Sequence, residues 1–160
     1  MEIKITQKYR EYSADMLAVV IQHPEERLEL FNELSSDFFY NEEHLLYRIL
    51  EKRKDSTGVI NEDYITIVLT RNLGMIYNSD NIDLNRYSSE NLVEEITLSV
   101  MALYNNLKNK PLKYDDLTVT KELFLNEYAL LVQEDIYKKG QQILESGLVV
   151  KGKLLQGLDD

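Results

Sequence analysis

The side chains best suited to acid-base or metal chemistry are few and far apart in this sequence. The chain of 160 residues contains two histidines, His23 and His44, and no cysteine. A zinc site would therefore need several carboxylate ligands, and neither histidine is flanked by His or Glu at a helical spacing suited to a tetrahedral ion. We expect His44, the third residue of a predicted helix, to serve in packing or capping. The sequence predicts no metal-binding residue.

Paired carboxylates are the nearest approach to a catalytic acid and base. The pairs Glu94-Glu95 and Asp115-Asp116 consist of adjacent residues, which point about 100° apart on a helix and do not converge on one substrate atom. Neither a Gly-x-Ser-x-Gly nucleophile motif nor a Gly-x-x-x-x-Gly-Lys-Ser/Thr phosphate loop occurs in the chain. We therefore predict no catalytic and no cofactor-binding residue here.

The overall composition narrows the class of protein. The net charge is −10, and because affinity for a nucleic-acid backbone comes mainly from lysine and arginine, this acidity favours protein partners over DNA. The absence of cysteine fits a reducing compartment, and no apolar run approaches the roughly 20 residues that span a bilayer. We expect a cytoplasmic protein with no membrane segment. Only two prolines and six glycines predict an all-α fold.

The first half of the chain contains start and end signals for four short helices. The first is predicted over residues 6–22, and Pro24 opens the second because proline at the first helical position loses no hydrogen bond. Asn41 and Asn61 are the predicted caps of the third and fourth helices. Residues 1–77 are thus expected to form a compact four-helix subdomain. The Asn- and Asp-rich residues 78–87 are expected to form a polar loop that separates this subdomain from the rest of the chain.

Residues 88–146 contain two much longer helical runs, 88–108 and 118–146, joined by a turn around Pro111. Each run carries apolar residues at steps of three and four, the 3.5-residue period of a coiled-coil seam. We expect the two helices to close on each other as an antiparallel hairpin. The predicted seam consists of Val93, Ile96, Val100, Leu103 and Leu107 on the first helix, and Leu125, Ala129, Val132, Ile136 and Ile143 on the second.

Other large side chains of the hairpin lie off this seam and need a further surface to pack on. We predict that part of this set forms contacts between protomers. The predicted interface residues are Leu92, Met101, Tyr104, Phe124, Tyr128, Leu130 and Leu131. Residues 147–160 contain three glycines and no apolar period, so they are predicted to begin a linker to a further domain.

A resemblance to a known family rests on short motifs that occur in order. There are three such motifs: Asp37-Phe38-Phe39-Tyr40-Asn41-Glu42-Glu43-His44, then Gly58-Val59-Ile60-Asn61, and finally Tyr128-Ala129 ahead of Val132. Together they resemble the N-terminal domain of DnaB-type replicative helicases. Asn61 stands where the family prefers aspartate, and residues 78–87 lack its double glycine. We therefore expect a distant, phage-encoded member.

The resemblance implies a non-catalytic collar domain. In such helicases this domain pairs through its helical hairpins, forms a trimer of dimers, and helps to contact primase and the helicase loader. ATP, magnesium and DNA are handled by the ATP-dependent motor domain beyond the linker. Two alternatives remain: a free-standing acidic adaptor or regulator that binds a helicase or primase, and the related helicase-binding domain of a primase.

Overall fold

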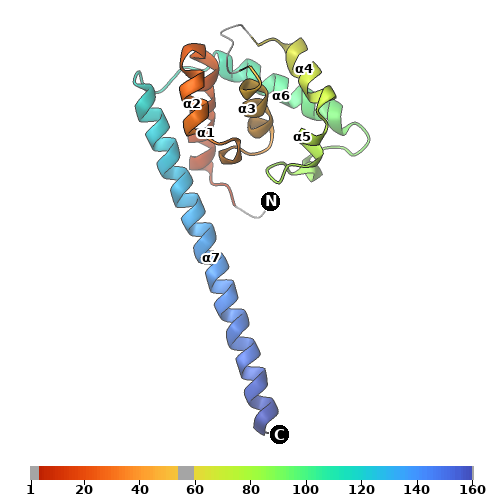
Figure 1. Cartoon of the computed structure of the whole chain (residues 1–160), viewed down its shortest axis with the longest axis vertical. Coiled ribbons are helices and arrows are strands. Elements are labelled where there is room, and N and C mark those ends of the chain that lie inside the picture. The colour runs from red at the N-terminus through yellow and green to blue at the C-terminus, as the bar shows by residue number, and fades with distance from the viewer. Residues whose placement is uncertain (1–3, 54–59, 160) are drawn as a thin grey trace.

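A computed structural model describes residues 4–53 and 60–159, and the side chains of its last helix as far as residue 147. The all-α prediction is confirmed, because the described residues form helices, turns and loops and contain no strand (Figure 1). The α-helices are α1 (Gln7–Gln22), α2 (Arg27–Glu33), α3 (Glu42–Glu51), α4 (Glu62–Arg71), α5 (Gly74–Tyr77), α6 (Leu92–Lys108) and α7 (Leu117–Asp159), and the 3-10 helices are η1 (Pro24–Glu26), η2 (Ser36–Phe38) and η3 (Leu84–Arg86).

Helix α1 is the centre of the fold. Thr6 caps it, since the Thr6 hydroxyl accepts a hydrogen bond of 3.1 Å from the Tyr9 backbone N–H. Six consecutive residues, 16–21, are buried, which is the pattern of a helix covered on every side. Helix α1 contacts α3, α6 and α7, so its burial holds the other elements in place.

A buried arginine closes the C-terminal end of α1. The Arg27 guanidinium donates to the backbone carbonyls of Val20 and Ile21, both at 2.8 Å. These carbonyls belong to the last turn of α1, where no further helical N–H is available to them. Gln22 extends the junction, because its side-chain amide donates to the carbonyl of Leu107 in the last turn of α6 and to that of Lys110 just after the helix.

The two predicted asparagine caps differ in outcome. Asn61 caps α4 as expected, with its side-chain oxygen 2.8 Å from the Tyr64 N–H. Asn41 occupies the N-cap position of α3 as predicted, but its side chain makes no capping hydrogen bond to that helix. Its backbone has a φ of 56°, and its side-chain oxygen instead accepts from the Asp83 N–H at 2.9 Å. Asparagine tolerates this left-handed φ better than most residues.

Residues 78–87 are packed onto the start of α3, which differs from the separating loop that we predicted. The Asn81 side-chain amide donates to the carbonyls of Asp37 and Phe39, both at 2.9 Å. The Asn41 N–H donates to the Asn81 carbonyl at 2.8 Å. The polar residues that suggested a detached loop therefore form hydrogen bonds that hold it against the residues just before α3.

Helices α6 and α7 do not form the predicted hairpin seam. Helix α6 packs against α1, α3 and α4, whereas α7 packs against α1. The seam residues of α6 face the core, with Ile96, Val100 and Leu107 buried, while Ile136 of α7 is 63% exposed. A 3.5-residue period identifies residues that share a face, but it does not identify what covers that face.

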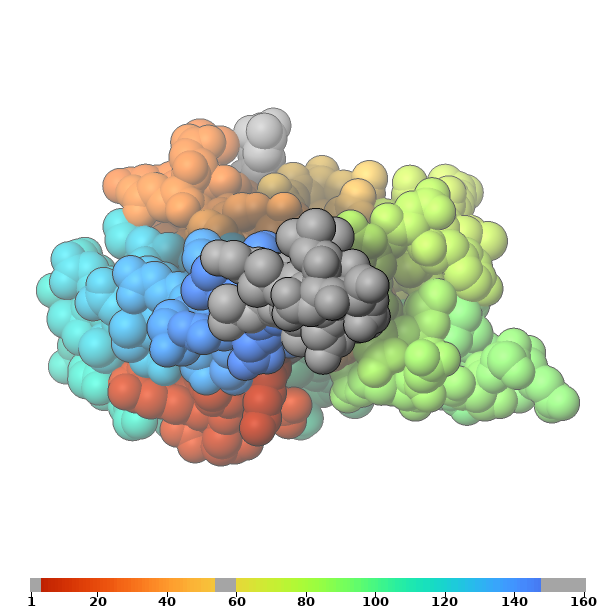
Figure 2. Space-filling view, turned by 90° about the horizontal axis from the view of Figure 1, so that it is seen from below, coloured from red at the N-terminus to blue at the C-terminus, as the bar shows by residue number. Residues whose placement is uncertain are grey.

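We predicted a linker over residues 147–160; helix α7 continues to Asp159, so residues 147–159 are helical, and residue 160 lies outside the described residues. Its 43 residues correspond to a length of about 65 Å at 1.5 Å per residue. Figure 1 shows the helix running far past the other elements, and a view from below shows its described side chains against the first helix (Figure 2). Isolated glycines cost a helix about 1 kcal/mol each without ending it.

Candidate interaction surface

Three of the predicted interface residues lie in the core of the chain itself. Tyr104, Phe124 and Leu131 are buried. The Phe124 ring stacks on Phe39 at a centroid distance of 5.1 Å and contacts Tyr9 at 5.5 Å. These side chains therefore attach α6 and α7 to the body and are not available to a second protomer.

The other predicted interface residues are divided between partial burial and exposure. Leu92, Met101 and Tyr128 are half-buried against the core. The Tyr128 ring lies 4.2 Å from the Phe38 ring, so the aromatic residues before α3 and those of α7 form one cluster. Leu130 is exposed.

The predicted seam residues are used in three different ways. Val93, Leu103 and Leu125 pack against the core with partial burial, and Val132 is half-buried. Ile96, Val100 and Leu107 are fully part of the core. Ala129, Ile136 and Ile143 are exposed, which means that the far half of the predicted seam has no partner among the described residues.

The exposed apolar residues of α7 share one face of the helix, which also carries Gln133 and which we call the α7 outer face. Leu130, Tyr137 and Leu144 repeat every seven residues, and so do Ala129, Ile136 and Ile143. At 100° per residue both rows fall within an arc of about 140°. The large members are 56 to 72% exposed: Leu130 56%, Ile136 63%, Tyr137 67%, Ile143 72% and Leu144 62%.

Two glycines lie between these apolar rows. Gly140 and Gly147 share the seven-residue spacing, and a Cβ atom placed on either would meet no described atom within 4 Å beyond its chain neighbours and the adjacent backbone of α7. Glycine inside a helix costs about 1 kcal/mol relative to alanine. Nothing else in the described chain uses the space that the missing side chains leave, which is the space that a close-lying backbone would need.

The charged residues of the same segment lie outside this face. Glu134 pairs with Lys138 at 2.9 Å and Asp135 pairs with Lys139 at 3.0 Å, each one turn along the helix. Both members of the Glu134–Lys138 pair are exposed, and such pairs contribute about 0.3 to 0.5 kcal/mol. Glu134, Lys138 and Lys139 are exposed, whereas Asp135 is half-buried on the side of α7 that carries Tyr128 and Leu131. All four charged residues lie outside the arc of the α7 outer face.

His44, one of the two histidines considered for chemistry, has a structural role. His44 is buried, its Nδ1 lies 2.7 Å from the Ser36 carbonyl oxygen, and its Nε2 lies 3.1 Å from the Ser79 hydroxyl. Burial lowers the pKa of His44. This matches the packing role predicted for it. Within residues 4–53 and 60–159, no group of three or more acidic or histidine side chains is arranged to hold a metal ion.

No helix in the described part of the chain combines the length and the apolar character that crossing a bilayer requires. Comparisons with protein-family models, with curated proteins and with solved structures found no match. The likeness to replicative helicases therefore rests on the sequence motifs alone.

Proposed function

We propose that this chain is a non-catalytic assembly module that binds a second copy of itself through the α7 outer face. The observation that carries the proposal is an apolar face with five large side chains at 56 to 72% exposure on a helix that extends beyond its own domain. Helices gain most of their stability from packing an amphipathic face. A partner on this face would supply packing for residues 136–147, all of which are exposed.

A second copy fits the face because a seven-residue repeat is self-complementary. Two helices with the same repeat can align their apolar rows along their whole length, and a two-fold dimer uses one patch on both subunits. The glycines would sit at the line of closest approach. The charged side of the helix, with Glu134 and Lys138, would remain in water.

The biological setting that we propose is the collar of a hexameric replicative DNA helicase, in the cytoplasm and of phage origin. The support is the ordered motif run, which in the structure forms η2 and the start of α3, the cap of α4 and the aromatic attachment of α7. Dimers would join as a trimer of dimers and contact primase and the loader. ATP, magnesium and DNA would belong to a motor domain.

Light scattering tests the self-association. We expect the unaltered chain to be a dimer or higher species at high micromolar concentration, and Ile136→Ser with Ile143→Ser to reduce it to a monomer. The matched control is Leu28→Ser with Ile67→Ser, which removes two exposed apolar residues from α2 and α4 and should leave the mass unchanged. A monomeric unaltered chain, or an unchanged mass for the α7 variant, would contradict the proposal.

A second candidate, an acidic adaptor that binds a helicase or primase, is favoured by the net charge of −10. The coding sequence after codon 160 separates the two. A Gly-x-x-x-x-Gly-Lys-Ser/Thr motif in frame supports the collar, and an immediate stop codon supports the adaptor. The helicase-binding domain of a primase would instead belong to a chain with primase motifs.

A further inference from the structure

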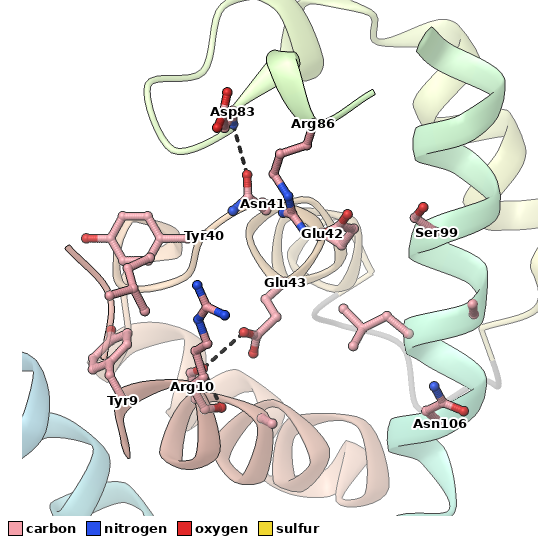
Figure 3. Close-up of a pocket in the computed structure, with 15 residues that line it drawn as sticks. Tyr9, Arg10, Tyr40, Asn41, Glu42, Glu43, Asp83, Arg86, Ser99 and Asn106 are labelled. Atoms are coloured by element: carbon pink, nitrogen blue, oxygen red, sulfur yellow. Dashed lines mark hydrogen bonds and ion pairs between the residues drawn. The ribbon is translucent and has the colours of Figure 1, made fainter. Parts of the chain in front are cut away.

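A cavity of about 750 Å³ opens between α1, the start of α3, the segment before α6, and α6 itself (Figure 3). This volume lies within the range of pockets that bind small organic groups. Tyr9, Arg10 and Ser13 line it from α1, Glu43 from α3, and Ala102 and Asn106 from α6. The cavity is separate from the α7 outer face, so a ligand could occupy it whether or not two copies of the chain associate.

The group of interest in this cavity is the Glu43 carboxylate. Its Oε1 accepts a hydrogen bond of 3.0 Å from the Ser13 hydroxyl. Its Oε2 is buried and has no hydrogen-bond partner among the described residues. Burial raises the pKa of Glu43 to about 7. A buried carboxylate oxygen without a donor is costly, and a ligand that donates to Oε2 would remove that cost.

Other charged groups around the cavity are engaged elsewhere or do not reach Oε2. Glu42 on α3 accepts from Arg86 at 3.1 Å and from the Tyr87 hydroxyl, so Arg86 is occupied. Asp83 accepts from the Asn85 N–H. Arg10 on α1 favours the ionised form of Glu43 through its charge, an effect smaller than burial, but no hydrogen bond or ion pair joins the two within the described residues.

We propose that this cavity binds the guanidinium group of an arginine side chain on a partner protein, with Glu43 as its counter-ion. A guanidinium presents a fork of N–H donors that matches a carboxylate, and it stacks on aromatic rings. The half-buried Tyr40 lines the same cavity. Burial raises the pKa of Tyr40 to about 12, so its ring is neutral at pH 7. The chain's net charge of −10 draws basic partners towards it.

The pH dependence follows from the carboxylate. Guanidinium binding requires ionised Glu43, and with a pKa of about 7 the ionised fraction rises about tenfold between pH 6 and pH 8. The charged groups facing it are Arg10 from α1, Glu42 from α3, and Asp83 and Arg86 from the segment before α6, while α6 lines the cavity with uncharged residues. We expect affinity to rise by up to about tenfold over this interval.

The test is an NMR titration of the full chain with capped Gly-Arg-Gly, capped Gly-citrulline-Gly and free arginine at pH 6 and pH 8. We expect the arginine peptide to shift the amide signals of Ser13 and Glu43, to bind more tightly at pH 8, and to bind more tightly than free arginine. The neutral citrulline peptide should not bind. Equal binding of citrulline would overturn the guanidinium assignment, and free arginine binding as tightly as the peptide would overturn the partner-protein assignment.

Amino-acid substitutions test whether the peptide binds in this cavity. Glu43→Gln should weaken binding at least tenfold, whereas Glu94→Gln, which removes an exposed charge of α6 outside the cavity lining, should not. Equal weakening by both would reduce the effect to net charge and overturn the proposal. Should Glu43→Gln fail to fold, Ala102→Phe offers a second test, because Ala102 is exposed at the cavity edge and a larger side chain there should block entry. Retained affinity in Ala102→Phe would equally contradict the site.

Discussion

At the scale of single residues, Arg27 is the side chain on which the junction of α1 and α2 depends. It is buried and donates to two carbonyls of the last turn of α1, and burial lowers the pKa of its guanidinium. Hydrogen bonds from a charged donor contribute more than neutral ones. Removal of the guanidinium would leave both carbonyls buried without a donor.

We predict that Arg27→Ala lowers the free energy of unfolding by about 2 to 4 kcal/mol. Urea denaturation monitored by circular dichroism measures this. Arg71→Ala provides the control, because Arg71 is exposed at the end of α4 and its loss should change stability by less than about 0.5 kcal/mol. A similarly small effect for Arg27→Ala would show that the two carbonyls do not need the arginine.

Glu43 gives a prediction about pH. Its pKa in the folded chain is raised to about 7 from 4.5, so between these values the folded state holds a proton that the unfolded state has lost. Stability attributable to this group therefore falls as pH rises from 4.5 to 7, and the penalty is complete above pH 7. Its size is up to about 3 kcal/mol.

Glu43→Gln removes the titration. We expect the difference in unfolding free energy between Glu43→Gln and the unaltered chain to move in favour of the variant as pH increases from 4.5 to 7, and to be constant above that. Urea denaturation of both proteins at pH 5, 6, 7 and 8 measures the difference. A difference that does not change with pH would mean that Glu43 titrates normally in the folded chain.

At the scale of elements, α7 provides the sharpest test of the assembly proposal. In an isolated helix, Gly140→Ala should increase helix stability by about 1 kcal/mol, because alanine is the better helix former. If a second backbone lies over Gly140, the added methyl group should weaken association at the same time. The two readouts move in opposite directions only when the glycine is part of an interface.

We therefore predict that Gly140→Ala raises helicity by circular dichroism at low concentration and increases the dissociation constant of the dimer by sedimentation analysis. Gln141→Ala is the matched control, since Gln141 is the adjacent exposed residue and lies about 100° away around the helix. It should leave the dissociation constant unchanged. Tighter association in Gly140→Ala would place the glycine outside any close contact.

The elements differ in how far the sequence could predict them. Local signals are sufficient where one hydrogen bond decides the outcome, as at Asn61, which caps α4 as expected. They are insufficient where the partner lies far along the chain. The side chain of Asn41 binds Asp83, and α6 packs on three N-terminal helices, because the tertiary arrangement supplies competing partners that periodicity cannot specify.

The candidate sites are less predictable than the elements. Glu43 resembles the acidic residues that commonly occupy a first helical turn, and only the tertiary packing of α1 over α3 buries its carboxylate. The residues predicted for an interface are large and off the predicted seam, but Phe124 and Tyr104 are taken up by the core. Ile136, which the period places in an internal seam, is instead one of the exposed residues that remain for an interface.

At the scale of the whole molecule, net charge opposes the association of two copies. Each chain carries −10, and salt screens repulsion between exposed charges with a Debye length of about 10 Å at 0.1 M. An apolar interface does not weaken with salt. We therefore predict that association strengthens between about 50 and 500 mM sodium chloride, measured by sedimentation equilibrium. Weaker association at high salt would point to an interface held by ion pairs.

The continuity of α7 makes the molecule a lever. The helix is fixed to the body where the Phe124 and Tyr128 rings meet Phe38, Phe39 and Tyr9, and it is unbroken from there to Asp159, a distance of about 46 Å at 1.5 Å per residue. A tilt of about 10° at this aromatic fulcrum would swing the far end by about 8 Å. A small rearrangement of these five rings would therefore displace the C-terminal end of α7, and any group attached to it, by a much larger distance.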